Sequence, residues 1–353
     1  MAALPNPDTA TVQAIYTHWQ QKLGRASRRL GASQIGQECE RRLFYSFRWA
    51  TNGEGFDGRM LRLFDRGHRE EAVFVAELRG IGVQVHDLNP QTGEQWEFSA
   101  CGGHFVAKID GAGLGFPERP KTWCVIGFKT ANDASFKATK KDGVQKAKPE
   151  HYAQNQIEMK LTGMTRTMYL MVNKNTDELY GETIREDAAA QEALEAKAAR
   201  VIFGAEPGPK LSEDPAHYKC KFCPASSVCH RKEMPQVSCR TCLHATPERD
   251  GDGRWSCAKH GHDLTLTNQL TACPDHLFIP ALVTWGVLDD ASEPEGWVQY
   301  KAADGFVFRN GPRDVGSYSS TELAAIPLAA LRSEELQAIR NQNLPNAQWV
   351  AAA

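Results

Sequence analysis

The chain has 353 residues, a length that allows one large domain together with one or two smaller ones. Its 41 lysines and arginines nearly balance 43 aspartates and glutamates, and the formal net charge is -2. This balance excludes nucleic-acid binding through overall charge, so any such contact requires a local basic channel. No apolar run is as long as a signal-peptide core or a membrane span, so we expect a cytoplasmic protein without membrane contact.

The N-terminal part of the chain is predicted to pass from helices to strands. Capping residues and apolar spacing predict helices over 8–23, 33–50 and 63–80. Short alternating or apolar runs, bounded by Gly, Pro and Asn, predict strands over 82–88, 94–99, 104–110 and 122–129. The last two of these strands are expected to form a hairpin across the Gly- and Pro-rich segment between them.

The rest of the first domain continues this mixture of elements. The pattern predicts a helix over 148–164, strands over 165–174 and 178–185, and an alanine-rich helix over 186–204 closed by Gly204. Together these elements indicate an α/β fold, with a mixed sheet flanked by helices.

The C-terminal part of the chain has a different character. From about 215 to 280 cysteines replace regular periodicity. Beyond 281 a hairpin is predicted over 296–311, with its turn near Asp304 and Gly305, followed by one or two short helices within 320–342. This last segment is therefore expected to be a small α+β unit.

Seven of the ten cysteines lie between residues 220 and 273, and in a reducing cytoplasm this density indicates metal binding rather than disulfides. Cys220, Cys223 and Cys229 are close enough in sequence to bind one metal centre from a single loop. Cys39, 181 residues before Cys220, is a candidate for the fourth ligand. Two alternatives remain open: Cys39 as a free buried thiol, and zinc held by the three later cysteines with His230.

A second set comprises Cys239, Cys242, Cys257 and Cys273, whose spacing is typical of a zinc ribbon with tetrahedral sulfur ligands. This segment has few apolar residues, so it needs a metal to fold stably. Zinc is expected here, in a structural or a DNA-binding role, and four histidines are alternatives for one ligand: His244, His260, His262 and His276.

The strand over 122–129 carries the residues that point to catalysis. Side chains alternate along a strand, so Gly127 and Lys129 point the same way, and Asp110 is expected beside them. An acid followed by acid-x-Lys on the next strand suits phosphodiester hydrolysis, because carboxylates hold a hard divalent cation that activates water. The lysine can stabilise the developing negative charge. In this chain Gly127 stands where the second acid belongs.

The segments KIDG, VIGFKTAN and HYAQNQIEMKLTGM together resemble the PD-(D/E)XK nucleases, in particular their RecB-like and phage exonuclease branch. The resemblance implies a restriction-endonuclease-like core and a metal-dependent deoxyribonuclease that processes DNA ends in phage or bacterial recombination and repair. It further implies Mg or Mn as cofactor, DNA as substrate, and a recombination or annealing protein as a partner. The implied catalytic residues are Glu71, Asp110, Lys129 and Gln154.

The resemblance also implies the metal ligands, which are Glu71, Asp110 and the backbone carbonyl of Phe128. Two positions depart from the family pattern: Gly127 replaces an acid, and Glu158 stands where a tyrosine belongs. Because a lost carboxylate weakens divalent-ion binding, the alternative function is a catalytically impaired DNA-binding or scaffold protein of the same fold.

The cysteines extend this resemblance to the RecB-like iron–sulfur nucleases, which include the CRISPR-associated RecB-like exonucleases and AddB. These proteins have one cysteine before the nuclease core and three after it. The resemblance implies a 4Fe–4S cluster on Cys39, Cys220, Cys223 and Cys229. The expected domains are a nuclease domain over 1–235, a zinc-binding module over 236–280 and a C-terminal segment over 281–353.

A basic segment follows the predicted catalytic strand and is expected to be a loop that contacts DNA phosphates. Its lysines are Lys137, Lys140, Lys141, Lys146 and Lys148. Phe136 and Tyr152, close to these lysines, are candidates for stacking on unpaired bases, although packing in the core is the favoured interpretation.

Overall fold

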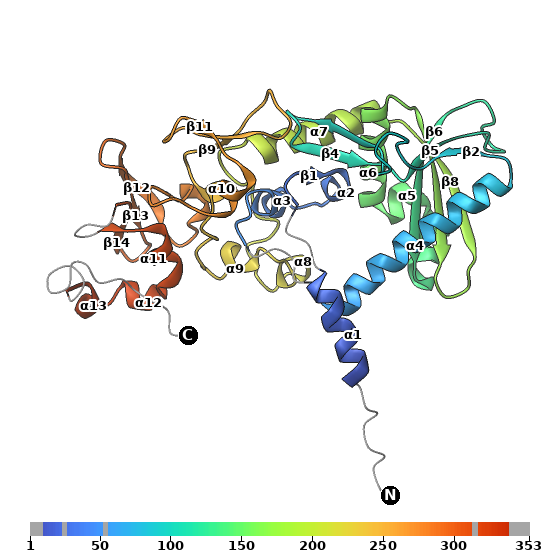
Figure 1. Cartoon of the computed structure of the whole chain (residues 1–353). Coiled ribbons are helices and arrows are strands. Elements are labelled where there is room, and N and C mark those ends of the chain that lie inside the picture. Colours follow the sequence, from blue (N-terminus) through green and yellow to red (C-terminus); the bar gives the residue numbers. More distant parts are fainter. Residues whose placement is uncertain (1–9, 23–26, 52–55, 313–316, 339–353) are drawn as a thin grey trace, which may run out of the picture.

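The computed structural model describes residues 10–22, 27–51, 56–312 and 317–338. Figure 1 shows an elongated molecule, with a five-stranded sheet at one end, the C-terminal strands at the other and the cysteine-rich segments between them. None of the described helices combines the length and the apolar character that crossing a membrane requires.

The five-stranded sheet is mixed, as predicted, and has the order β2-β5-β6-β7-β8. Its strands are β2 (Gln84–His86), β5 (Gly111–Leu114), β6 (Cys124–Ala131), β7 (Arg166–Asn173) and β8 (Leu179–Arg185). The central strand β6 pairs in parallel with β7 and antiparallel with β5. Its first five residues are buried, as expected for a strand covered on both faces.

Helices cover both faces of this sheet (Figure 1). Helix α4 (Gly58–Gly80) packs on one face, where the rings of Phe74 and Phe128 stack at 5.0 Å between centroids. Helices α5 (Asp133–Ala147) and α6 (Pro149–Thr162) pack on the other face, and α7 (Ala188–Phe203) packs against α6. The predicted α/β core of the restriction-endonuclease-like kind is thus confirmed.

The predicted hairpin of 104–110 with 122–129 is wrong. The first segment forms β4 (Phe105–Lys108), which joins β1 (Leu30–Gly31) and β3 (Glu97–Ala100) in a separate sheet. The partner of β6 is instead β5, a strand made of glycine, alanine and leucine. Gly113 leaves room for the Phe116 ring, since a Cβ atom there would lie 2.6 Å from it.

The predicted N-terminal helices change in their bounds. Helix α1 covers Ala10–Gln21, and residues 8, 9 and 23 of its predicted range lie outside the described residues. The single helix predicted over 33–50 is two helices, α2 (Ala32–Ile35) and α3 (Glu40–Phe47). Gly36 allows a close approach to α6 at this break, because a Cβ atom there would lie 2.5 Å from the Cα of Glu150.

The cysteine-rich part is built from short elements. They are α8 (Tyr218–Lys221), α9 (Ser226–Cys229), η1 (Cys239–Thr241), β9 (Ala245–Pro247), β10 (Trp255–Cys257), β11 (His262–Asp263), α10 (Leu266–Leu270) and η2 (Pro280–Leu282). Strands β9 to β11 form an antiparallel sheet, and its residue Trp255 is fully buried in the same hydrophobic cluster as Phe47 and Phe105.

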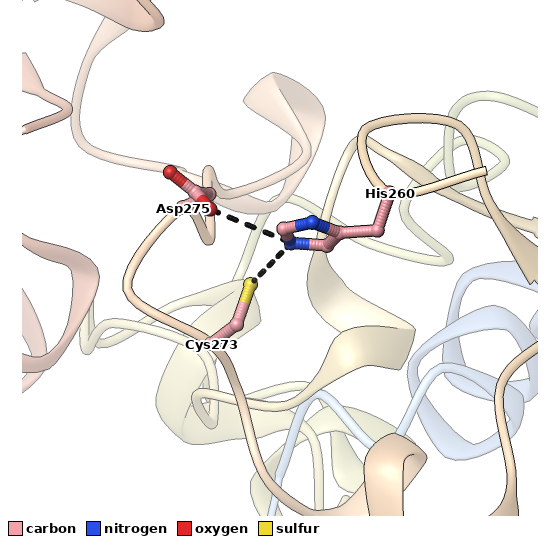
Figure 2. Close-up of side chains that lie close together, drawn as sticks. All are labelled: His260, Cys273 and Asp275. Atoms are coloured by element: carbon pink, nitrogen blue, oxygen red, sulfur yellow. Dashed lines mark hydrogen bonds and ion pairs between the residues drawn. The ribbon is translucent and has the colours of Figure 1, made fainter. Parts of the chain in front are cut away.

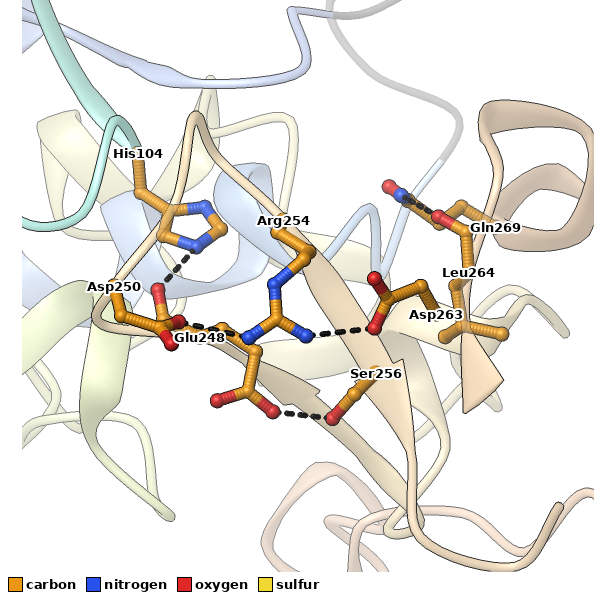
Figure 3. Close-up of polar contacts among 8 residues, drawn as sticks. All are labelled: His104, Glu248, Asp250, Arg254, Ser256, Asp263, Leu264 and Gln269. Carbon is orange, nitrogen blue, oxygen red and sulfur yellow. Dashed lines mark hydrogen bonds and ion pairs between the residues drawn. The ribbon is translucent and has the colours of Figure 1, made fainter. Parts of the chain in front are cut away.

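Polar contacts complete the junction between this sheet and β4 (Figure 3). The ring of His104, directly before β4, contacts the Glu248 carbonyl oxygen at 3.0 Å through Nε2. Within the small sheet, Arg254 forms ion pairs with Asp250 at 2.8 Å and Asp263 at 2.6 Å. The sheet of β9 to β11 therefore packs on the first domain through both apolar and polar contacts.

The C-terminal segment is α+β, as predicted. It contains β12 (Val287–Ser292), β13 (Trp297–Lys301), β14 (Val307–Asn310), β15 (Ser317–Tyr318), α11 (Ser320–Ala325), α12 (Leu328–Leu331) and α13 (Glu334–Ala338). Strands β13 and β14 form the expected hairpin around Asp304 and Gly305. Residues 339–342 of the predicted helices lie outside the described residues.

Candidate active site and metal centres

The end of β6 brings the predicted acid and lysine together. Lys129 Nζ lies 3.8 Å from Asp110 Oδ2, and both side chains are largely buried. The same carboxylate oxygen accepts a hydrogen bond from the Phe128 backbone N–H at 2.8 Å. Asp110 lies in the chain segment that connects β4 to β5. These two contacts hold its carboxylate toward the ammonium group of Lys129 on β6.

Glu71 lies on α4 and is half-buried. Burial raises the pKa of the Glu71 carboxyl, and the nearby Asp110 carboxylate raises it further, whereas His68 and Lys129 lower it. Helix α4 packs on β6 from the face opposite to α6, so the predicted helix acid comes from the other side of the strand that carries Lys129.

Helix α6 contributes the predicted glutamine together with a second acid. Gln154 Nε2 donates a hydrogen bond to Glu158 Oε1 at 2.7 Å. Glu158 is only 2% exposed. Burial raises the pKa of Glu158 to about 8; the Asp110 carboxylate adds to this effect, and the Lys129 ammonium and the Gln154 amide oppose it. Glu158 is thus a buried acid on the helix that packs on β6.

The position of the missing acid faces α6. A Cβ atom built on Gly127 would lie 3.3 Å from Asn155 Oδ1 and 3.7 Å from Thr167 Cγ2. Both Asn155 and Thr167 are fully buried. Within the described residues, both side-chain polar atoms of Asn155 and the hydroxyl of Thr167 lack a hydrogen-bond partner. Such unsatisfied groups are uncommon in protein interiors.

The donor set around Lys129 suits a hard divalent cation, which prefers carboxylate oxygens. Asp110, Glu71 and Glu158 supply such oxygens, although they do not all lie within 4.8 Å of one another. The Phe128 carbonyl is the predicted backbone ligand, and its residue lies on β6 between Gly127 and Lys129.

A cavity of about 640 Å³ reaches Gln154 from the side of β4 and the cysteine-rich sheet. Four basic residues line it: Arg28, Arg29, Lys108 and Arg240. Glu97 pairs with two of them, at 2.7 Å from Arg29 and 3.7 Å from Lys108. The near-neutral chain therefore has a local basic cavity beside the candidate site.

The predicted basic loop is a helix, so this prediction is wrong in its structure. The segment forms α5, which begins where the Asn132 side chain accepts a hydrogen bond from the Ser135 N–H at 2.8 Å. Three of the predicted DNA-contacting lysines form ion pairs along it, Lys137 with Asp133, Lys140 with Glu178 and Lys146 with Asp142. Lys141 is exposed, and Lys148, which follows the helix, is half-buried.

The two aromatic candidates next to these lysines belong mainly to the interior. Phe136 is fully buried in the core between α5 and the sheet, as the favoured interpretation predicted. Tyr152 is half-buried, and its hydroxyl donates to Asp187 at 3.3 Å.

The four cysteines predicted to hold an iron–sulfur cluster line one cavity of about 280 Å³. Cys39 directly precedes α3, whereas Cys220, Cys223 and Cys229 lie in and between α8 and α9. Burial raises the pKa of the Cys223 thiol, and the neighbouring Cys39 and Cys220 thiols act in the same direction. The alternative ligand His230 lines the same cavity.

Two polar contacts join the segments that carry these cysteines. Arg41 Nε donates to the Gly208 carbonyl at 2.7 Å, and Lys219 forms an ion pair with Glu38. The thiols from the two ends of the first domain are thus brought into one place, although the chain between them spans the whole sheet.

The second set of cysteines also gathers around one cavity, of about 280 Å³, whose lining includes Cys239, Cys242, Cys257, Cys273, His244, His260, His262 and His276. Burial raises the pKa of Cys239 to about 12, and the three other thiols act in the same direction. His276 Nε2 contacts the Ser238 carbonyl at 3.0 Å and Thr241 Oγ1 at 3.3 Å. Because these contacts already engage Nε2, this nitrogen is not free to bind a metal.

Figure 2 shows that His260 Nε2 points toward Cys273 Sγ at 3.5 Å and toward Asp275 Oδ2 at 3.4 Å. Among the residues that the structure describes, this is the one group of three His, Cys, Asp or Glu side chains whose ligand atoms all lie within 4.8 Å of one another. The two four-cysteine sets are less compact, so a metal would draw their thiols closer together.

Comparisons with known proteins add little to this geometry. No family model matches the chain, and no curated protein matches it. Among solved structures, it is similar to SSO0001, with 14% identity, a TM-score of 0.38, and coverage of 63% of this chain and 97% of that one. It is also similar to an alkaline exonuclease, LHK-Exo from Laribacter hongkongensis, and to that protein's complex with dAMP. Both show 17% identity over 52% of this chain and 90% of theirs, with TM-scores of 0.35 and 0.34. At these scores the likeness carries no argument about function.

Sequence patterns did not identify several residues near the candidate site. Glu158 was noted only as a departure from a family pattern, and Asn155 gave no signal. The basic run of Arg28 and Arg29 was the available sign of the cavity. Arg240 could not be found from sequence, because it reaches the cavity from a distant part of the chain.

Proposed function

We propose that the chain is a metal-dependent deoxyribonuclease that processes DNA ends. The observation that carries this proposal is the contact between Lys129 and Asp110 at the end of the central strand β6. A lysine held 3.8 Å from an acid, with Glu71 and Gln154 nearby, suits hydrolysis of a phosphodiester.

In this proposal each residue has a defined task. Asp110 and Glu71, with the Phe128 carbonyl, would hold Mg or Mn, which supplies an activated water and neutralises phosphate charge when bound. Lys129 stabilises the negative charge that develops on the phosphate. Gln154 orients its neighbour Glu158 through the hydrogen bond described above.

DNA would approach along basic residues on two sides of the site. The cavity that reaches Gln154 offers the exposed Arg28, and α5 offers exposed lysines. Phosphate contacts of this kind position a strand without reading its sequence. A protein that anneals or recombines the resulting DNA is the partner that fits this activity.

The test is degradation of linear DNA by the purified protein in the presence of Mn²⁺. We expect Lys129→Ala to abolish the degradation, and Lys301→Ala, which removes an exposed lysine on the distant strand β13, to leave it unchanged. Equal activity of wild type and Lys129→Ala would contradict the proposal.

Gly127 favours a second candidate, a DNA-binding or scaffold protein of the same fold that does not cut. In that case the wild type binds DNA but is inert with Mn²⁺, and Gly127→Glu, which restores an acid on β6, gains activity. Since the new side chain would begin 3.3 Å from Asn155 Oδ1, Asn155 has to shift slightly to accept it.

We further propose that Cys39, Cys220, Cys223 and Cys229 hold a 4Fe–4S cluster that closes the domain over 1–235. The support is that all four thiols line one cavity. The cluster would join the start of α3 to α8 and α9 as a structural clip. We expect iron in the purified protein and a visible absorbance that Cys220→Ser removes; zinc in stoichiometric amount without iron would contradict this assignment.

For the module over 236–280 we propose a zinc ion on Cys239, Cys242, Cys257 and Cys273. The four thiols line a common cavity, and His260 lies beside Cys273 as the alternative fourth ligand. We expect one zinc ion per chain that Cys242→Ser removes. Retention of zinc in Cys273→Ser but not in His260→Ala would assign the fourth ligand to the histidine. The remaining residues, 281–353, then form the separate C-terminal segment.

A further inference from the structure

The proposed metal site lacks an acid at the position nearest to its lysine. Gly127 precedes Lys129 by two residues on β6, so any side chain at 127 would point to the same face as the lysine. That face is covered by α6, since a Cβ atom at 127 would contact Asn155 of this helix. A group that replaces the missing acid therefore has to come from α6.

Helix α6 carries such a group. Glu158 follows Asn155 by three residues, so the two side chains lie on the same side of the helix. Glu158 is 2% exposed, and its helix packs on β6, the strand that carries Lys129. Gln154, one turn earlier, fixes Glu158 Oε1 by a hydrogen bond of 2.7 Å. A buried carboxylate held in this way is costly unless a cation compensates it.

The acids near Lys129 come from both faces of the sheet. Asp110 Oδ2 lies 3.8 Å from the ammonium of Lys129. Glu71 and Glu158 lie on α4 and α6, the two helices that pack on β6. Among the described residues, His68 acts electrostatically on Glu71, and Lys129 and Lys148 act on His151.

An independent observation indicates that the space next to Gly127 takes a polar ligand. Asn155 is fully buried and faces this space, yet its amide nitrogen and oxygen have no hydrogen-bond partner among the described residues. The Thr167 hydroxyl on β7, beside the same space, is equally unsatisfied. Buried amides and hydroxyls are normally bonded to protein, water or an ion. The polar groups thus extend the site from Glu158 toward the position of the missing acid.

We propose that Glu158 supplies from α6 the carboxylate that Gly127 does not supply from β6, so that Asp110, Glu71 and Glu158 together hold the divalent ion. This inference rests on the proposed nuclease function. It makes the chain a competent metal-binding protein despite Gly127. The competing role for Glu158 is that of a counter-ion which only neutralises Lys129.

Binding of Mn²⁺ in the absence of DNA distinguishes these roles. Free Mn²⁺ is measured by electron paramagnetic resonance during titration of wild type, Glu158→Gln and Asp110→Asn. Mn²⁺ prefers oxygen ligands, so the cysteine sites do not compete. The matched control is Glu182→Gln, which removes a half-buried carboxylate of β8 that accepts bonds from the Val144 N–H and the Tyr180 hydroxyl.

We expect Glu158→Gln to weaken Mn²⁺ binding at least about tenfold, Asp110→Asn to weaken it as much, and Glu182→Gln to leave it unchanged. Circular dichroism and the thermal midpoint without Mn²⁺ show whether each variant is folded. If Glu158→Gln is unfolded, Glu158→Asp takes its place; this variant keeps the charge but shortens the side chain, and it is expected to bind Mn²⁺ more weakly.

The outcomes separate this inference from the proposed function. If the folded Glu158 variant binds Mn²⁺ as tightly as wild type while Asp110→Asn does not, Glu158 is only a counter-ion, and the inference is overturned although the nuclease proposal stands. If wild type and Asp110→Asn bind Mn²⁺ equally poorly, there is no metal site at Lys129, and the proposed function falls as well.

Discussion

Arg240 is a buried cation held by aromatic rings and carbonyl oxygens. Its guanidinium carbon lies 3.8 Å from the ring centre of Trp49 and 4.7 Å from that of Trp255. It donates hydrogen bonds to the backbone carbonyls of Phe47 and Arg28 and to the side-chain oxygen of Gln269. Burial and the adjacent Arg48 lower the pKa of Arg240. This one side chain joins the cysteine-rich part to the N-terminal helices.

We expect Arg240→Ala to lower the free energy of unfolding by about 3 kcal/mol, because it removes charged hydrogen bonds and leaves buried carbonyls unpaired. Urea denaturation measures the loss. Arg309→Ala is the matched control, since Arg309 also stacks on a tryptophan, Trp297, but is only half-buried. Equal effects of the two substitutions would show that Arg240 does not join the two parts.

Glu158 could not be predicted as a site residue from the sequence, unlike the other candidates. The family resemblance names Gln154. Spacing along the strand is enough to place Lys129 beside Asp110, and the structure has them 3.8 Å apart. Spacing was not enough for Glu158, because a glutamate on a helix is ordinarily exposed to solvent. Its burial depends on which face of α6 packs against β6, and only the fold determines that.

At the scale of elements, α5 changes how the basic segment is interpreted. Carboxylates already neutralise Lys137 and Lys140, at 2.8 Å from Asp133 and 2.5 Å from Glu178. Such exposed pairs contribute little to stability, but a paired ammonium is less free to bind a phosphate. Lys141 lies on the same helix and is exposed.

We therefore expect Lys141→Ala to weaken DNA binding and to lower the salt dependence of the binding constant by about 0.9, the value for one phosphate contact. Lys137→Ala, the matched control, should have a smaller effect on the same slope. Fluorescence anisotropy at several salt concentrations, without divalent ions, measures both. A slope that Lys141→Ala leaves unchanged would place the DNA away from α5.

Helices and strands were predicted correctly where a strong apolar pattern ends at a residue that stops the element. The helix of 186–204 and the strands β7 and β8 are of this kind, and Gly204 closes the helix as predicted. Strand β5 escaped prediction because its residues, Gly-Ala-Gly-Leu, give no alternating apolar signal. Helix α5 escaped because its Gly143, with φ of 77°, interrupts the helical pattern. Pairing across the sheet, which decides the case of β5, is not encoded in local spacing.

At the scale of the whole molecule, His104 connects stability to pH. Its ring is fully buried between Phe47, Phe203 and Trp255. Burial lowers the pKa of His104 from its ordinary value of 6.5 to about 4, although the hydrogen bond to Glu248 opposes this shift. As the pH falls from 6.5 to 4, the unfolded chain binds a proton that the folded protein resists, so stability decreases with falling pH.

We expect the free energy of unfolding to fall by about 1.4 kcal/mol for each pH unit in this range through His104 alone. His104→Gln keeps a polar contact but cannot titrate, so its stability should be lower at neutral pH and should depend less on pH. Urea denaturation between pH 6.5 and 4 measures both proteins. Parallel curves for wild type and variant would show that His104 titrates normally.

The proposed zinc ion would stabilise more than its own module. Cys242, Cys257 and Trp255 belong to one hydrophobic cluster with residues of the first domain, such as Phe105 and Val201. Metal binding contributes folding free energy wherever its ligands converge only in the folded state. Loss of zinc should therefore loosen this shared core as a whole. The effect should extend to the cluster around Tyr300, because Leu277 and Phe278 of the module belong to that cluster.

We expect removal of zinc by a chelator to lower the midpoint of the main thermal transition, and Cys242→Ser to lower it in the same way without the chelator. Calorimetry should show one transition for the core shared by the first domain and the zinc module, because their side chains interdigitate around Trp255. If chelation instead produced a separate early transition and left the main one in place, the module would fold independently of the first domain, and the contacts of Arg240 and Trp255 would contribute little to holding the two together.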